Sequence, residues 1–255
     1  MSYVLLNEEL VEAGDAKVPI ADRGLLLADG LFETCLAQGG QVVCLSAHLQ
    51  RMRDGAKLLQ IPVPYDNQQI EDHCQLLLNK NGLADETAAI RITLTRGVGG
   101  RGIKLPSNPQ PTMFITAVAY QSPAEPAKVI VASHTWTKIP PLSNYKTLNY
   151  QDSIIARLEA EEAGADDAIM CNTAGRVVCT TVGNIFLLID GTWVTPPISD
   201  GALPGIARAK KIAEAKAAGD KIVVRSVEHH ELAKCQAAYL TNSLVGRRDI
   251  VIPLT

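Results

Sequence analysis

The segment NYKTLNYQDS occupies residues 144–153 and leads into the pattern of a long helix, predicted over residues 148–163. Three apolar side chains share one face of this helix: Ile154, Ile155 and Leu158. Lys146 stands two residues before the helix, where burial would lower its pKa and free its amine as a Schiff-base nucleophile. A single lysine is more often a surface charge, so the segment leaves both roles open.

The composition excludes several classes of protein. The chain has 255 residues with 24 basic and 27 acidic side chains, a net charge of −3 and 47% apolar residues. Such a near-neutral chain lacks the clustered lysines and arginines that bind nucleic acid. No apolar run approaches the roughly 20 residues that span a bilayer, and the acidic N-terminal segment does not resemble a signal peptide. The sequence therefore predicts a soluble cytoplasmic enzyme of one large or two small domains.

The six cysteines are scattered without a CxxC pair, so they predict reduced thiols, neither disulfides nor a zinc site. They are Cys35, Cys44, Cys74, Cys171, Cys179 and Cys235. The neighbouring His229 and His230 cannot face one way, and no third ligand follows at a suitable spacing. We therefore expect no metal site.

A polar segment with two prolines, QSPAEPAK at residues 121–128, interrupts two strand-like runs and predicts a domain boundary. We expect an N-terminal α/β domain at residues 1–120, a linker at 121–127 and a C-terminal α/β domain at 128–255 that carries Lys146. Strands and helices occur in both halves without strict alternation, which indicates a mixed α/β or α+β architecture.

In the first half, Ser46 is the predicted N-cap of a helix over residues 46–60. Four side chains at helical spacing would face a core: Leu49, Met52, Ala56 and Leu59. His48 and Arg51 are three residues apart and share a neighbouring face of the helix. Exposure to solvent is the more ordinary role for such a pair.

Four other segments carry polar residues, and each also has an ordinary explanation. DRGLLLADGLFET at residues 22–34 fits a turn and an edge strand. GALPGIAR at 201–208 opens a helix, whose unpaired N–H groups can hold a phosphate. YLTNSLVGRR at 239–248 fits either a turn or an anion cradle. RGVGGRG at 96–102 lacks the spacing of a dinucleotide fingerprint.

Taken in chain order, together with VGNIFLL at residues 182–188, these segments resemble the class IV aminotransferase family of pyridoxal phosphate enzymes, also called fold type IV. The resemblance covers about residues 22–246. It implies a two-domain, D-amino acid aminotransferase-like α/β fold. It also implies a homodimer and a pyridoxal 5′-phosphate cofactor in the cleft between the domains.

Within the family the sequence is most similar to the 4-amino-4-deoxychorismate lyases, which form 4-aminobenzoate and pyruvate for folate synthesis. The similarity lies in LSAHLQRMRDGAKLL at residues 45–59, in RGVGGRG and in TNSLVG at 241–246. D-amino acid transaminases usually clamp the substrate carboxylate with an Arg and a His in the second of these segments. Here Arg101 is present as a candidate carboxylate ligand, and Ile103 takes the His position.

The resemblance assigns roles to matching residues. Lys146 corresponds to the lysine that holds the cofactor covalently and moves protons. Thr34 is a further candidate, for proton delivery, on the sole ground that it belongs to the DGLFET motif. Arg51 corresponds to the arginine that binds the cofactor phosphate, and Glu33 to the acid that orients it. The remaining implied cofactor contacts are Tyr150, Thr241, Asn242 and the helix-start amides of Ile206 and Ala207, where the family often has Thr instead of Ala.

Cys179 departs from the family pattern. It stands five residues before Asn184, where the family places a Glu that pairs with the pyridine nitrogen. That carboxylate keeps the nitrogen protonated and makes the ring a strong electron sink. A thiol, with an ordinary pKa of about 8.5, is a poorer partner. We expect transamination to suffer more than lyase chemistry, because expulsion of pyruvate produces an aromatic ring.

Two alternatives remain open. The first is a class IV aminotransferase acting on D-amino or branched-chain amino acids, against which Cys179 and the missing His argue. The second is a pyridoxal phosphate-binding protein with lost or altered catalysis, which Cys179 and Ala207 favour. Retention of Lys146, Arg51 and Glu33 argues against the second. In each case we expect a small anionic amine as the ligand, with no nucleic acid and no membrane partner.

Overall fold

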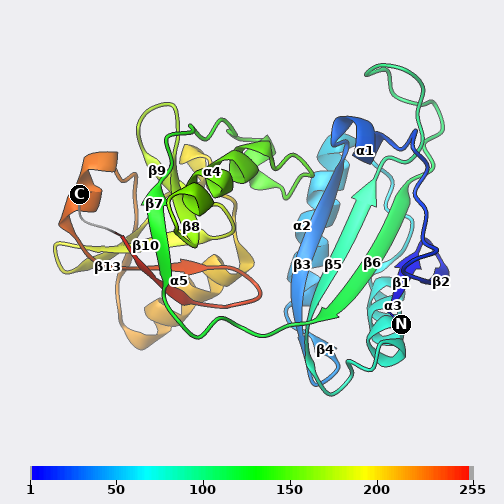
Figure 1. Ribbon diagram of the computed structural model, residues 1–255, viewed down its shortest axis with the longest axis horizontal. Helices are drawn as coiled ribbons and strands as arrows, with labels where there is room; N and C mark the ends of the chain where they lie inside the picture. Colours follow the sequence, from blue (N-terminus) through cyan, green and yellow to red (C-terminus); the bar gives the residue numbers. More distant parts are fainter. Residues whose placement is uncertain (1, 253–255) are drawn as a thin grey trace. The chain divides into compact units, whose positions relative to one another are not determined.

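The computed structural model describes residues 2–252. The chain divides into two compact units, one made of Met1–Gln121 with Tyr145–Asn149 and the other of Ser122–Asn144 with Tyr150–Thr255 (Figure 1). Each unit contains one β-sheet with helices, so the predicted mixed α/β architecture is confirmed. Within the described residues, no helix combines the length and apolar content needed to cross a bilayer.

The first unit is built on a six-stranded antiparallel sheet with the order β2-β1-β6-β5-β3-β4. Its strands are β1 (Tyr3–Leu6), β2 (Glu9–Glu12), β3 (Gly30–Gln38), β4 (Gln41–Val42), β5 (Thr87–Thr95) and β6 (Thr112–Ala119). Strand β3 pairs with β5 over nine residues, and only the two-residue β4 lies beyond it. The strand that follows the DRGLLLADG segment therefore lies next to the edge of the sheet.

Two helices, α2 (Leu45–Leu59) and α3 (Asn67–Lys80), supply the buried core on one face of this sheet. The predicted N-cap Ser46 is wrong, because α2 begins at Leu45 after Cys44 in the left-handed conformation, with no side-chain cap. Helix α3 instead has a capping box between Asp66 and Gln69. The predicted inward side chains Leu49, Met52 and Ala56 are buried.

The segment Tyr145–Asn149, which contains Lys146, is bound to β3. The amide of Phe32 donates to the Lys146 carbonyl at 2.9 Å, and the amide of Leu148 donates to the Gly30 carbonyl at 3.1 Å. The lysine was expected in the C-terminal domain, but these hydrogen bonds attach it to the first unit. Backbone pairing with a distant strand overrides its position along the chain.

The second unit contains an eight-stranded mixed sheet with the order β12-β11-β10-β13-β14-β7-β8-β9. The strands are β7 (Ala127–Val131), β8 (Asp167–Cys171), β9 (Val177–Thr180), β10 (Asn184–Ile189), β11 (Thr192–Thr195), β12 (Ile222–Val224), β13 (Cys235–Thr241) and β14 (Arg248–Val251). Three neighbouring pairs are parallel, namely β11–β12, β14–β7 and β7–β8. Helices α4 (Gln151–Glu162) and α5 (Ile206–Ala218) complete the unit.

Helix α4 packs through small residues. Its buried side chains are Ser153, Ala156 and Ala160, and the two alanines belong to a core shared with β8 and β9. The apolar face predicted from the sequence lies outward, since Ile154, Ile155 and Leu158 are 50%, 40% and 55% exposed. Periodicity correctly grouped these three side chains, but it did not show which face meets the sheet.

Candidate functional site

Lys146 lies against an aromatic ring of β3. Its Nζ atom is 4.2 Å from the centroid of the Phe32 ring, and the Arg91 guanidinium is 3.6 Å from the same centroid. Arg91 stands directly opposite Thr34 in the β3–β5 register, so the two side chains share a face of the sheet. This face therefore brings together the predicted Lys146 and Thr34 with Phe32 and a second cation.

The sequence patterns do not single out Arg91 as a candidate site residue. The one signal was a charged side chain within the otherwise uncharged strand TAAIRITLT, and an exposed strand position explains such a residue equally well. Its nearness to Lys146 depends on the β3–β5 register and on the docking of residues 145–149, neither of which local sequence reveals.

On the opposite face of β3, Glu33 organises Arg51. Oε1 and Oε2 of Glu33 accept hydrogen bonds from Arg51 Nε and Nη2 at 2.8 and 2.6 Å. His48 Nδ1 donates to Oε2 at 2.7 Å, and the side chains of Glu33 and His48 are each 1% exposed. The structure thus brings the predicted Glu33 and Arg51 together, and adds His48 as a second donor that fixes the carboxylate.

The ionisation of Glu33 follows from these contacts. Burial opposes the charged carboxylate, but the hydrogen bonds from His48 and Arg51 and the charge of Arg51 outweigh it, so the pKa of Glu33 lies below its ordinary value. The fork geometry uses the Nε edge of Arg51 for Glu33. This pairing holds the planar guanidinium in a fixed orientation, and a guanidinium is well suited to recognition of a phosphate.

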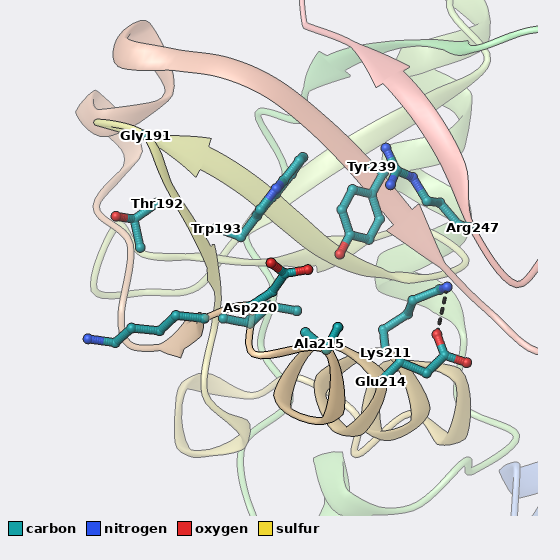
Figure 2. Close-up of a pocket in the computed structure, with 12 residues that line it drawn as sticks. Gly191, Thr192, Trp193, Lys211, Glu214, Ala215, Asp220, Tyr239 and Arg247 are labelled. Carbon is teal, nitrogen blue, oxygen red and sulfur yellow. Dashed lines mark hydrogen bonds and ion pairs between the residues drawn. The ribbon is translucent and has the colours of Figure 1, made fainter.

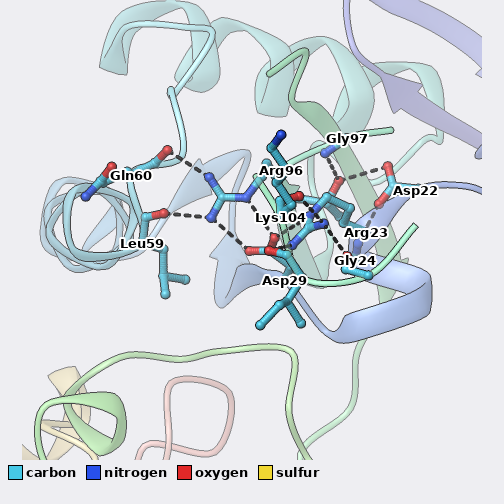
Figure 3. A network of polar contacts seen from close by, with 12 residues as sticks. Asp22, Arg23, Gly24, Asp29, Leu59, Gln60, Arg96, Gly97 and Lys104 are labelled. Atoms are coloured by element: carbon cyan, nitrogen blue, oxygen red, sulfur yellow. Dashed lines mark hydrogen bonds and ion pairs between the residues drawn. The ribbon is translucent and has the colours of Figure 1, made fainter. Parts of the chain in front are cut away.

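A second network, shown in Figure 3, anchors the glycine-rich loop of the first unit. Asp29 accepts from Arg23 Nε at 2.7 Å and from Arg96 Nε and Nη2 at 2.7 and 3.0 Å. Burial opposes ionisation of Asp29, yet the bonds to Arg96 and Arg23 hold its pKa below the ordinary value. Arg23 begins the short helix α1 (Arg23–Leu27), so the DRG motif forms a clamp that the sequence did not predict.

The loop that carries Arg101 closes around Arg23. The Arg23 guanidinium donates to the carbonyls of Gly102, Lys104 and Ile103 at 3.1, 3.2 and 3.4 Å. A Cβ at Gly99 would lie 2.5 Å from Arg23 Cδ, which explains a glycine there. Arg101 and Ile103 are exposed on this loop, and Arg101 is not brought to Lys146 by any contact within the described residues.

In the second unit, the start of α5 meets the ends of β10 and β13. Asn184 pairs with Thr241 across these strands, and its side-chain amide donates to the Leu203 carbonyl at 2.8 Å. A Cβ at Gly205, the N-cap of α5, would lie 2.0 Å from Asn184 Oδ1. The predicted residues Ile206, Ala207 and Thr241 are thereby gathered at one place.

The hydrogen-bonding groups at this place are incompletely used. Gly205 offers no side-chain cap, so the first amides of α5 have no side-chain acceptor from the N-cap. Thr241 is 1% exposed, and its Oγ1 has no hydrogen-bond partner in the described part of the chain. Asn242 Oδ1 accepts from the amides of Leu244 and Val245, both at 3.0 Å, so its side chain shapes the following turn. A bound anion would satisfy the amides and the hydroxyl together.

Cys179 is the third residue of β9, and it is 7% exposed. Burial raises the pKa of its thiol far above the ordinary value, and the Asp167 carboxylate acts in the same direction, so the thiol stays neutral. Burial also lowers the pKa of Lys138, whose Nζ is 4.7 Å from the centroid of the Tyr150 ring. Tyr150 is the N-cap residue of α4 and is half-buried.

Figure 2 shows a cavity of about 560 Å³ elsewhere in the second unit. Its walls come from α5, β11 and β13, with Trp193 and Tyr239 on one side and the Lys211–Glu214 ion pair on the other. None of the predicted site residues lines it. This cavity is therefore separate from the predicted site residues.

The class IV amino-transferase family model matches residues 30–251. A protein of Methanocaldococcus jannaschii, provisionally assigned as a branched-chain-amino-acid aminotransferase, is 34% identical over 94% of this chain and 84% of its own length. The aminodeoxychorismate lyase of Vibrio harveyi is 28% identical over 90% of this chain and 84% of its own. The structure of 4-amino-4-deoxychorismate lyase from Pseudomonas aeruginosa has a TM-score of 0.82 and 28% identity, covering 98% of this chain and 90% of that one.

Proposed function

Because the chain belongs to the class IV aminotransferase family, we propose that it is a 4-amino-4-deoxychorismate lyase. Membership of this family means that the chain is a pyridoxal phosphate-dependent enzyme with the mixed α/β fold of class IV enzymes. The choice of reaction within the family rests on the residues of this chain.

The residues fit a pyridoxal 5′-phosphate group. At the start of α5, the amides of Ile206 and Ala207 and the unpartnered Thr241 Oγ1 suit its phosphate. We assign Arg51, oriented by Glu33, to the same phosphate, and Lys146 to the covalent attachment. Asn242 holds the phosphate-binding turn, and Tyr150 is assigned a contact with the ring.

When bound, pyridoxal phosphate withdraws electrons from the carbon that carries the substrate amine. We propose that the Lys146 amine removes the proton from this carbon and that Thr34 assists its delivery. Lys146 and Arg91 approach the same Phe32 ring, and Thr34 faces Arg91 across the strands. This grouping supports a substrate whose carboxylate meets Arg91 while its amine-bearing carbon meets Lys146. Arg101 is assigned a second carboxylate.

Cys179 is the observation that carries the choice of the lyase. Its buried, neutral thiol supplies no negative charge to hold a proton on the pyridine nitrogen. Transamination needs a strong electron sink in both half-reactions, so it suffers most from this change. Loss of pyruvate from aminodeoxychorismate creates the aromatic ring of 4-aminobenzoate, and this driving force makes a weaker sink sufficient.

A branched-chain aminotransferase is the second candidate. The 34% identity with the Methanocaldococcus jannaschii relative favours it, and branched-chain aminotransferases are also among the solved structures of similar fold. Arg91 suits this reaction as well, because amino donors and 2-oxo acid acceptors carry carboxylates. The two reactions therefore require the same anion-binding groups. They differ in how strongly the cofactor ring must withdraw electrons.

Incubating the holoenzyme with aminodeoxychorismate tests the proposal, with 4-aminobenzoate and pyruvate measured as products. Equal amounts of both products would support the lyase. Failure to form 4-aminobenzoate, combined with conversion of the cofactor to its amine form by branched-chain amino acids, would establish the aminotransferase instead. The Cys179→Glu variant should gain transaminase activity, while Cys179→Ser, a neutral control of similar size, should not.

The remaining features of the proposal follow the family resemblance. We propose a cytoplasmic homodimer that acts in folate biosynthesis, with the domain division at residues 121–127. Sedimentation analysis of the holoenzyme checks the oligomeric state. A monomer at working concentration would contradict that part of the proposal.

A further inference from the structure

Helix α5 buries an arginine where an amphipathic helix usually buries apolar side chains. Arg208 is 9% exposed and is the buried residue of this helix. Its Nη2 donates to the Pro196 carbonyl at 3.0 Å, while its Nε has no hydrogen-bond partner in the described residues. Arg208 therefore holds a fixed position and retains an unused donor.

Among the ion pairs of residues 2–252, none involves Arg208, although other arginines of the second unit, such as Arg176 and Arg225, have acidic partners. Burial alone lowers the pKa of Arg208, and a guanidinium stays charged at every working pH. A buried charge without a counter-charge is unfavourable, so an anion close to this helix turn would stabilise Arg208.

Two further sets of groups at the start of α5 can also bind an anion. Arg208 belongs to the first turn of α5, whose N-terminal amides carry partial positive charge and receive no side-chain cap from Gly205. Thr241 Oγ1 is buried and unpartnered, and Thr241 faces Asn184, which contacts Gly205. The start of α5 thus combines a buried cation in its first turn with amides that receive no side-chain cap, and Asn184 links it to the buried Thr241. Ala207 itself contributes no polar side chain.

We propose that Arg208 is a positioning residue that supplies the counter-charge for a phosphate dianion at the start of α5. The inference rests on the proposed function in one respect, since that function makes the dianion the phosphate of pyridoxal phosphate. Arg208 acts through its charge and not through a direct contact with the phosphate. The reason is that its Nε is buried and its Nη2 donates to the Pro196 carbonyl. It strengthens the cradle for the phosphate and has no part in proton transfer.

Arg208→Gln removes the positive charge but keeps a hydrogen-bond donor, because the glutamine amide can still donate to the Pro196 carbonyl. Apoenzyme is titrated with pyridoxal phosphate and, separately, with pyridoxal, which lacks the phosphate. We expect the variant to bind pyridoxal phosphate about tenfold more weakly, a change of about 1.4 kcal/mol, and pyridoxal as the wild type does. Arg208→Lys, which keeps the charge, should stay within about threefold of wild type for both ligands.

Arg225→Gln is the matched control, because Arg225 lies in the same unit but is already paired with Glu231 at 2.8 Å. It should leave the ratio of the two affinities unchanged. Equal weakening of both ligands in Arg208→Gln, or an unchanged ratio, overturns the inference. If Arg208→Gln does not fold, Arg208→Lys decides, and a tenfold loss specific to pyridoxal phosphate refutes the role of charge.

Inorganic phosphate gives a second readout without any cofactor. It should raise the unfolding temperature of wild-type apoenzyme more than that of Arg208→Gln, and equal shifts contradict the inference. Neither measurement uses a lyase substrate. A protein that shows the phosphate effect but makes no 4-aminobenzoate therefore refutes the proposed reaction and leaves the role of Arg208 standing.

Discussion

The Glu33→Gln substitution tests the arrangement that orients Arg51. Gln has nearly the shape of Glu, but it removes the negative charge and replaces one acceptor oxygen by an amide NH₂. Glu33 accepts three hydrogen bonds, two from Arg51 at 2.8 and 2.6 Å and one from His48 at 2.7 Å. In the variant, the NH₂ group must face one of these N–H groups, so two hydrogen-bond donors meet without an acceptor between them.

The expected cost follows from burial and from the number of bonds. Hydrogen bonds to charged groups contribute about 1.5–3 kcal/mol each, and breaking a buried charge pair by removing one partner costs about 3–5 kcal/mol. Glu33 is 1% exposed, so solvent cannot replace the lost contacts. We expect the free energy of opening β3 and α2 to fall by about 3–5 kcal/mol. Cofactor binding should also weaken, because Arg51 is no longer held in one orientation.

Hydrogen exchange followed by mass spectrometry of the apoenzyme is the suitable assay. Both tryptophans, Trp136 and Trp193, belong to the second unit, so their fluorescence does not report on Glu33. Peptides from β3 and α2 should lose protection, while peptides from β10 and β13 should not. Glu214→Gln, which changes an exposed carboxylate paired with Lys211, is the control and should alter neither set. Unchanged protection of β3 and α2 in Glu33→Gln refutes the reasoning.

Three more predictions concern covalent attachment, backbone space and pH. Borohydride reduction of the holoenzyme followed by peptide mapping should place a pyridoxyl group on Lys146, and an unlabelled Lys146 would remove the cofactor assignment. Gly97→Ala should lower the unfolding temperature by several degrees, because its Cβ would lie 1.7 Å from the Gln110 carbonyl oxygen at a backbone φ of +82°. Gly100→Ala is the control and should leave the unfolding temperature unchanged, because a Cβ there would have no atom within 4 Å. Equal effects of the two substitutions would contradict this account. The lowered pKa of Glu33 means that its stabilising contribution is complete above the ordinary Glu pKa of about 4.3 and is lost as the pH falls through the lower folded-state value. Hydrogen exchange should therefore differ between wild type and Glu33→Gln at pH 7, and this difference should shrink as the pH falls below about 4.3. A constant difference would rule out the charge as the cause.

The strongest predictions from the sequence concerned groups whose chemistry depends on position along the chain. Lys146, Arg51 and the start of α5 were each singled out within a short motif, and the order of these motifs indicated the family. The family and its pyridoxal phosphate chemistry are confirmed by the match over residues 30–251. A helix start presents unpaired amides whatever surrounds it, so local sequence can predict an anion site there.

The contacts that surround the candidate site residues depend on partners far apart in the chain. Arg91 meets Phe32 through the β3–β5 register, and His48 meets Glu33 through the packing of α2. Arg208 is buried, and no ion pair within the described residues involves it. Periodicity also grouped Ile154, Ile155 and Leu158 without showing that they face outward. Strand register and the choice of packed face arise from the whole core, so local patterns do not contain them.

The sequence by itself therefore indicated the family and its cofactor and predicted Lys146 as the reactive lysine, because each depends on particular side chains or amides at set intervals along the chain. Only the tertiary structure decided the surroundings of those groups. It attached residues 145–149 to β3, kept the Cys179 thiol neutral by burial and gave Arg208 no ion-pair partner among residues 2–252. Burial and pairing of charges are properties of the folded core, where distant segments exclude water, and they set how strongly each group acts.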